Sequence, residues 1–113
     1  MIDVSHIDTS TSVFGKRYPF PVAFAPSAMQ KLAHPSGETE VAMAAAKIGV
    51  NMTLSSQSTT SLEDVASSRD GLHDSPEMWF QLYLTADPTL SLRLIQRASG
   101  KTSMITLRLF LLV

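Results

Sequence analysis

Cysteine is absent from the 113 residues, and neither sign of charge is in excess. Without cysteine the chain can hold no disulfide, no thiolate metal site and no thiol nucleophile. Nine basic residues stand against ten acidic residues, which gives a formal net charge of -1. Because nucleic-acid binding needs a basic face, the sequence predicts no nucleic-acid partner.

Long hydrophobic runs are also missing. The longest apolar stretch, residues 104–113, is interrupted by Thr106 and Arg108 and is shorter than the ~20 residues of a membrane-spanning helix. We therefore expect no membrane span. The first residues are polar and acidic, unlike a secretory signal. The chain ends on apolar residues where complete domains more often end on a polar surface segment, which indicates truncation.

What is present is a regular alternation of apolar runs and helix signals. The hydrophobic share of 44% is close to that of globular proteins. Four apolar runs begin near Val22, Val50, Met78 and Ser103, and we expect each of them to be a strand. The run Val22–Ala25 is typical of a strand buried on both faces of a parallel sheet.

The stretches between these runs predict three helices. Ser36 is the expected N-cap of the first, with Glu38 near the positive end of its dipole and Gly49 at its end. A capping box at 60–63 opens the second, and Asp87, followed by proline, opens the third. The expected apolar face of the third helix consists of Leu90, Leu94, Ile95 and Ala98.

Strand and helix alternate three times before a last strand, which predicts an α/β fold with a parallel sheet and helices outside it. This βα repeat fits half of a (β/α)8 barrel or most of a doubly wound sheet, and the periodicity does not choose between them. We expect residues 1–20 to be an extended or hairpin lead-in with a turn at Gly15–Lys16. Residues 21–102 would form three βα units, and residues 103–113 a divergent fourth strand or truncated end.

Ligands of parallel βα folds bind at the carboxyl ends of the strands. This rule selects three short segments, Pro26–Ala28, Ser55–Gln57 and Gln81–Tyr83. Their hydroxyl, amide and phenol groups suit a neutral heteroaromatic ring or a phosphate. Composition alone favours a plainer interpretation, in which they are ordinary loops with serine caps. Neither GxGxxG nor GxxxxGK[ST] follows any of the apolar runs.

The three histidines give weaker signals. His6 lies in the polar start of the chain. His34 precedes the first helix, where a structural hydrogen bond is favoured over a general base because no partner acid is identifiable. His73 lies between Asp70 and Asp74, which resembles a metal site only loosely, and a solvated loop is favoured. We therefore predict no metal site.

The string PVAFAPSAMQKLAHP, residues 21–35, resembles the first barrel strand and loop of the FMN-dependent 2-hydroxy-acid oxidases and dehydrogenases. That family includes glycolate oxidase and flavin-linked L-lactate dehydrogenase. Three further stretches are similar to the family in order and spacing, namely residues 3–5 with 7–11, residues 52–56 with 61–66, and residues 80–83. The resemblance extends over about residues 2 to 98. It implies the first half of a (β/α)8 barrel that holds FMN at the carboxyl ends of its strands.

The resemblance also implies a role for each of the three segments. Tyr83 would contact both the flavin and the substrate, a small 2-hydroxy acid that the family oxidises to the 2-oxo acid. Ser55 would hydrogen-bond the flavin, and Gln81 would bond its pyrimidine side. The further residues expected to contact the flavin ring are Pro26, Ser27 and Ala28.

The departures from the family concern the catalytic groups. Its catalytic histidine, two substrate-binding arginines and a flavin-contacting lysine lie downstream of the third barrel strand, and none can be placed here. His34 is not that histidine. A Thr-Val-Asp motif is expected at the fourth strand but is absent, so Thr106 is not assigned to the flavin. Gln57 stands where the family usually has an aromatic side chain lining the substrate pocket.

We therefore predict the N-terminal half-barrel of an FMN-dependent 2-hydroxy-acid oxidoreductase that is inactive as an isolated chain. The alternative is a non-catalytic remnant that binds flavin or another protein. Unclosed barrel edges would make either form prone to self-association. Another FMN-binding barrel, such as an isomerase, is disfavoured by residues 26–35. The family implies an intracellular location without choosing cytoplasm, peroxisome or mitochondrion.

Overall fold

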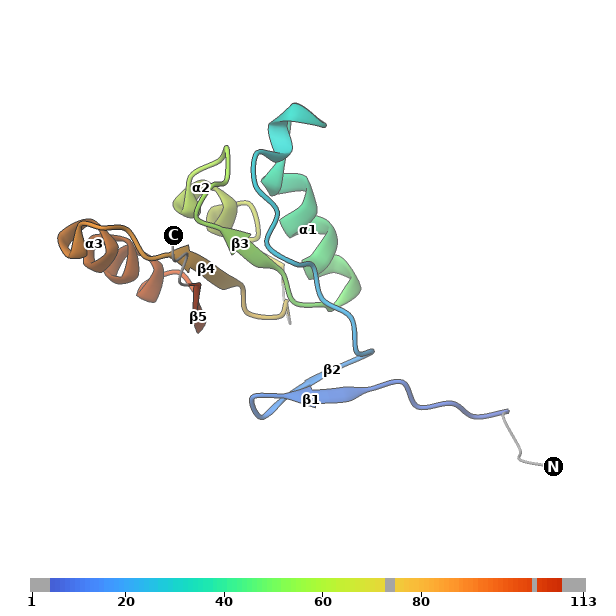
Figure 1. Ribbon diagram of the computed structural model, residues 1–113. Coiled ribbons are helices and arrows are strands. Elements are labelled where there is room, and N and C mark those ends of the chain that lie inside the picture. The colour runs from blue at the N-terminus through green and yellow to red at the C-terminus, as the bar shows by residue number, and fades with distance from the viewer. Residues whose placement is uncertain (1–4, 73–74, 103, 109–113) are drawn as a thin grey trace.

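The computed structural model describes residues 5–72, 75–102 and 104–108. Helices and strands alternate in the second part of the chain, as the sequence predicts. Within the described ranges, no helix has the length and apolar character needed to cross a membrane. The elements are β1 (Thr11–Val13), β2 (Lys16–Tyr18), the 3-10 helix η1 (Gln30–Leu32), α1 (Glu38–Ile48), β3 (Thr53–Ser55), α2 (Leu62–Ser67), β4 (Trp79–Tyr83), α3 (Pro88–Ser99) and β5 (Met104–Arg108) (Figure 1).

An antiparallel hairpin of β1 and β2 precedes the βα units and lies below them in Figure 1. Its two turn residues, Phe14 and Gly15, have φ angles of 51° and 79°, and positive φ at both positions is what a type I′ hairpin turn requires. The turn therefore begins one residue before the predicted Gly15–Lys16. The Phe14 ring meets the Trp79 ring edge-on, with centroids 5.6 Å apart, so the hairpin is anchored at the amino end of β4.

The strands β3, β4 and β5 form one parallel sheet in that order. Phe24 adds a further parallel bridge to Met52, beside β3. Its N–H donates to the Asn51 carbonyl at 2.9 Å, and its carbonyl accepts from the Thr53 N–H at 3.0 Å. Four chain segments thus run parallel in sequence order, and the predicted first half of a (β/α)8 barrel is confirmed. Residues 103 and 109–113 of the expected fourth strand lie outside the described residues.

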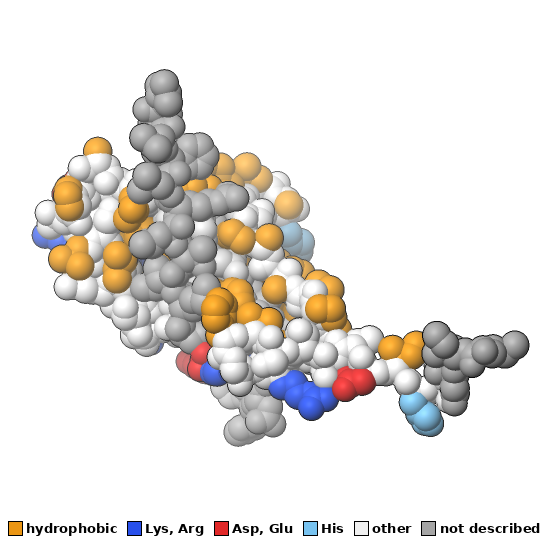
Figure 2. All heavy atoms as spheres, turned by 60° about the horizontal axis from the view of Figure 1, so that its bottom comes forward, with side chains coloured by type: hydrophobic (Ala, Val, Ile, Leu, Met, Phe, Trp, Pro, Cys, Tyr) orange, Lys and Arg blue, Asp and Glu red, His pale blue; other side chains and the backbone are white. Residues whose placement is uncertain are grey.

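The segment Val22–Ala25 differs from its predicted burial. It makes a single bridge instead of a strand, and Val22 and Phe24 are 61% and 37% exposed. The bridge to Met52 protects one edge, and none of the described strands pairs along the other edge. Burial on both faces was therefore a wrong prediction. Figure 2 shows apolar side chains at the surface on the face of the molecule that carries the hairpin.

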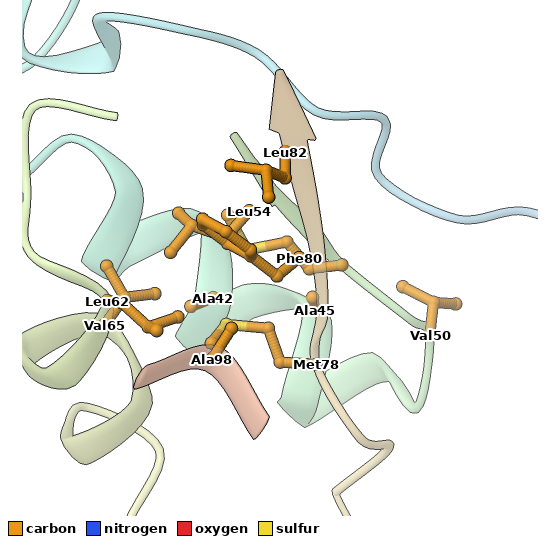
Figure 3. Packing of buried hydrophobic residues seen from close by; sticks show 11 residues of the cluster. Ala42, Ala45, Val50, Leu54, Leu62, Val65, Met78, Phe80, Leu82 and Ala98 are labelled. Atoms are coloured by element: carbon orange, nitrogen blue, oxygen red, sulfur yellow. The ribbon is translucent and has the colours of Figure 1, made fainter. Parts of the chain in front are cut away.

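The core lies between the sheet and the helices (Figure 3). Phe80 and Leu82 of β4 point into it, so Gln81 between them lies on the opposite face of the strand. The same alternation puts Leu54 into the core and its neighbour Ser55 on the other face. The remaining members of the core are Ala42, Ala45, Val50, Met52, Leu62, Val65, Met78 and Ala98.

Side-chain caps begin α2 and α3. The Ser61 hydroxyl accepts a hydrogen bond from the Asp64 N–H at 3.1 Å, one residue later in the chain than the predicted capping box. The Asp87 carboxylate accepts from the Thr89 N–H at 2.8 Å, and Pro88 occupies the first helical position as predicted.

The start of α1 differs from the sequence prediction. Its N-cap is Gly37, not Ser36. The Gly37 φ angle is +48°, and a Cβ at this position would lie 2.7 Å from the Lys31 Cγ. Backbone conformation and close packing therefore require glycine here. At the other end, Gly49 closes the helix in the left-handed conformation, as expected.

Leu90 of α3 is 46% exposed, so its place on the predicted apolar face was wrong. Ala98 is fully buried, and Leu94 and Ile95 pack against the core as expected. The apolar packing of α3 against the core thus lies in its second half, and Ser91 in the first half is buried as well.

The contrast between two leucines tests this core. We expect Leu54→Ala to lower the free energy of unfolding by about 2–5 kcal/mol, because Leu54 is fully buried and its truncation leaves a cavity. Leu90→Ala should change it by about 0.5 kcal/mol or less, because half of that side chain already faces solvent. Urea unfolding followed by circular dichroism measures both values. Equal losses would contradict the described packing of α3.

Candidate functional site

The strand-end segments selected from the sequence meet at one edge of the sheet. The parallel register sets Ser55 beside Gln81. The Ser55 hydroxyl donates to the Gln81 Oε1 at 3.5 Å, and the Ser56 N–H donates to the Gln81 carbonyl at 2.9 Å. The Met29 N–H donates to the Gln57 carbonyl at 3.2 Å, which brings the chain after Pro26–Ala28 against the same loop.

The amide of Gln81 has an unused hydrogen-bond donor. The residue is 2% exposed, and its Nε2 has no hydrogen-bond partner among the described residues. Leaving such a buried donor unsatisfied costs about 1–3 kcal/mol. Ser55 is also buried, and its hydroxyl accepts from the Gln57 N–H at 3.1 Å. A ligand with a neutral hydrogen-bond acceptor would satisfy the Gln81 amide.

Of the other expected site residues, Tyr83 ends the strand that carries Gln81, and Pro26–Ala28 lie just before Met29, which contacts the loop after β3. Tyr83 is half-buried and its N–H donates to the Ser56 hydroxyl at 3.4 Å. Because Tyr83 lies two residues after Gln81, its side chain projects from the same face of β4. The segment Pro26–Ala28 is exposed, and the Ser27 carbonyl accepts from the Gln30 side-chain amide at 3.4 Å.

A buried carboxylate, Glu38, lies behind these loops. Its Oε1 accepts the backbone N–H groups of Gln30, at 3.1 Å, and of Thr59, at 2.8 Å. Its Oε2 accepts the hydroxyl groups of Thr59 and Thr60, both at 2.8 Å. The sequence indicated only a favourable position near a helix dipole. The groups that donate to Glu38 lie 8, 21 and 22 residues away in the sequence. Because no local sequence pattern links them, this cluster could not be predicted from the sequence.

The charge of Glu38 is stabilised by neutral donors. Burial by itself raises the pKa of this carboxyl group, but hydrogen bonds from the Thr59 backbone and the Thr60 hydroxyl outweigh burial and lower the pKa from 4.5 to about 2. Glu38 is therefore ionised at neutral pH although its side chain is buried.

The His34 imidazole has the structural role expected from the sequence. Its Nδ1 accepts from the Ser36 N–H at 3.3 Å, and its carbonyl accepts from the Gly37 N–H at 2.9 Å. These bonds shape the turn that enters α1. His73 and Asp74 lie outside the described residues, so the solvated loop favoured for them stays a prediction.

Comparisons with known proteins agree with this fold. A family model described as FMN-dependent dehydrogenase matches residues 1–107. Glycolate oxidase 3 of Arabidopsis thaliana is 46% identical, and glycolate oxidase of Spinacia oleracea 44% identical, over 98 residues. Each match covers 87% of this chain and 25% of the relative. A crystal structure of mandelate oxidase with (S)-4-hydroxymandelic acid is 38% identical, with a TM-score of 0.82 over 95% of this chain and 29% of that chain.

The chain therefore belongs to the FMN-dependent dehydrogenase family. This confirms the resemblance seen in residues 21–35, and it confirms FMN as the cofactor. The chain spans about a quarter of the length of the curated relatives that it matches.

The pKa of Glu38 predicts a distinct response to acid. The folded-state pKa of about 2 lies below the ordinary value of 4.5, so the ionised carboxylate stabilises the fold above about pH 4.5 and loses this effect as the pH falls to about 2. We expect Glu38→Gln to lower the free energy of unfolding by about 1–2 kcal/mol at neutral pH. This deficit should shrink between pH 4.5 and pH 2.

Thermal unfolding at a series of pH values measures the deficit. Glu40→Gln is the matched control, because Glu40 is exposed on the same helix and should show no comparable change with pH. A Glu38→Gln deficit that stays constant through the acid range would refute the assignment of the charge.

Proposed function

We propose that this chain forms a flavin-binding part of an enzyme that uses FMN to oxidise a small 2-hydroxy acid to the 2-oxo acid. The observation that carries the proposal is the buried pair Ser55 and Gln81 at the carboxyl ends of two neighbouring strands, with the Gln81 Nε2 donor unused among the described residues. The names of the glycolate oxidase relatives and the mandelate oxidase structures support a 2-hydroxy acid as the substrate class, because glycolate and mandelate are both 2-hydroxy acids.

The geometry suits the edge of a flat, neutral heteroaromatic ring. The Gln81 Nε2 would donate to a ring carbonyl. Its Oε1 already accepts from the Ser55 hydroxyl and retains a second lone pair for a ring N–H. Ser55 thereby fixes the orientation of the Gln81 amide. FMN, when bound, supplies the group that accepts hydride, and these side chains orient it and tune its electronics.

The remaining proposed contacts with the flavin and the substrate come from Pro26–Ala28 and from Tyr83. Pro26, Ser27 and Ala28 are exposed beside the loop that follows β3 and would lie against the ring. Tyr83 shares the strand face of Gln81, so its phenol would reach a hydroxy acid held over the ring.

The reaction also needs a base for the substrate's hydroxyl proton and cations for its carboxylate. The three strand-end segments contain no charged side chain. His34 is engaged at the entry to α1. We therefore infer that the 113 residues bind flavin without oxidising substrate. The exposed edge at Val22 and Phe24 supports a tendency of the isolated chain to self-associate. An intracellular location stays a prediction from the family.

Flavin binding tests the roles of Gln81 and Ser55. We expect Gln81→Leu to weaken FMN binding about tenfold or more, because the substitution removes the donor and the acceptor at similar volume. Ser55→Ala should weaken binding about threefold to tenfold. Titration with quenching of FMN fluorescence measures the dissociation constants. Gln96→Leu is the matched control, since Gln96 is exposed on α3. Unchanged affinity in Gln81→Leu would refute the site.

Anaerobic mixing tests the absence of turnover. The purified 113-residue chain, loaded with FMN, is mixed with glycolate or lactate while the visible flavin absorption is followed. We expect no bleaching, because the chain offers no assigned base or carboxylate-binding cation. Dithionite, added last, should bleach the flavin and serves as the positive control. Bleaching by either hydroxy acid would show that the chain carries its own catalytic groups.

A further inference from the structure

Two loops that carry proposed flavin contacts are joined to each other at several points. The first loop is defined as residues 26–34 and the second as residues 55–61. The Met29 N–H donates to the Gln57 carbonyl at 3.2 Å, and the Lys31 N–H donates to the Thr59 hydroxyl at 3.2 Å. The loops therefore hold a defined separation where each of them borders the flavin site.

Glu38 joins the same two loops through a single oxygen. Its Oε1 accepts an N–H from Gln30 in the first loop and an N–H from Thr59 in the second. Its Oε2 takes two hydroxyl groups from the second loop. Because the carboxylate is fully buried, water cannot replace a donor without opening the cluster.

Backbone strain coincides with this connection. Met29 has φ 54° and ψ 41°, a left-handed conformation that residues other than glycine seldom adopt. It stands between Ala28, a proposed flavin contact, and Gln30, whose N–H Glu38 binds. Such a conformation persists only where the surroundings hold it, and strained residues of this kind occur at ligand sites. The Met29 N–H bond to the Gln57 carbonyl and the neighbouring Gln30 N–H bond to Glu38 hold this conformation.

We propose that Glu38 is a positioning residue for the flavin. It acts through the two loops and sets the distance between Pro26–Ala28 and Ser55, so that both contact the ring together. This inference rests on the proposed function. Glu38 itself is occupied by Gln30, Thr59 and Thr60, so it would act through the loops and not by contact with the flavin or the substrate.

The substitution Glu38→Gln separates charge from shape. The amide oxygen can still accept the two backbone N–H groups, but the new amide nitrogen faces the hydroxyls of Thr59 and Thr60, which donated to the carboxylate. These hydroxyls must turn, and the link between the loops loosens. Thr60→Val is a milder second variant that removes one donor from Oε2 and keeps the side-chain volume.

The test measures FMN dissociation constants for both variants well below their melting temperatures. We expect Glu38→Gln to bind FMN about tenfold more weakly and Thr60→Val about threefold more weakly. Met78→Ala is the stability control, because Met78 is buried just before the amino end of β4, whereas the site lies at the carboxyl end of that strand. It should lower the melting temperature and leave FMN affinity within about twofold.

Amide hydrogen exchange of the flavin-free chain gives an independent measurement. In Glu38→Gln the amides of Gln30 and Thr59 should lose part of their protection, because a neutral amide oxygen accepts their hydrogen bonds more weakly than the carboxylate does and the loosened cluster opens more often. The amide of Leu82 in the sheet should keep its protection. Unchanged exchange at Gln30 and Thr59 would refute the link that Glu38 makes between the two loops, whatever the result with flavin.

The outcomes separate this inference from the proposed function. If the unchanged chain does not bind FMN, or Gln81→Leu binds it normally, the proposed function fails and the inference fails with it. If Gln81→Leu weakens binding but Glu38→Gln and Thr60→Val do not, only the positioning role fails. If affinity falls in step with melting temperature in all variants, Met78→Ala included, Glu38 is structural and the inference is also overturned.

Discussion

The buried carboxylate of Glu38 is the constraint on which the loops at the carboxyl ends of the strands depend. An ionised group removed from water needs hydrogen bonds to replace its hydration. Here the donors come from η1 and from the loop after β3, while the carboxylate belongs to the first residue of α1. None of these three segments can move away without leaving a charge or an N–H unsatisfied. One side chain thereby fixes the relative positions of two βα units.

The pleat of two short strands separates the core from the site. Leu54 and Phe80 point toward the helices, whereas their neighbours Ser55 and Gln81 lie on the other face, side by side in the parallel register. A shift of one residue would exchange the faces and put an amide into the core. The same packing that stabilises the sheet therefore positions Ser55 and Gln81, the groups proposed to contact the flavin, and the proposed site needs no separate scaffold.

Local signals predicted the parts of this structure that local interactions determine. Asp87 begins α3 and Gly49 ends α1 because a cap involves only a few neighbouring residues. The strand-end rule found Ser55 and Gln81 because βα order fixes which ends of parallel strands adjoin. The misplaced features depend on distant contacts. Position 37 needs glycine because Lys31, six residues earlier, lies close to it, and the 61% exposure of Val22 depends on which segments cover it, neither of which a local pattern records.

The electrostatics of the proposed site indicate how recognition is divided. The groups at the strand ends are an amide, a phenol and hydroxyls, and the nearby negative charge of Glu38 is enclosed by its own donors. Neutral donors and acceptors distinguish a heteroaromatic ring well, but they give little attraction to a phosphate or a substrate carboxylate, which need cations. These segments are thus suited to the uncharged part of FMN. Binding of its phosphate and of a hydroxy acid has to rest on groups outside them.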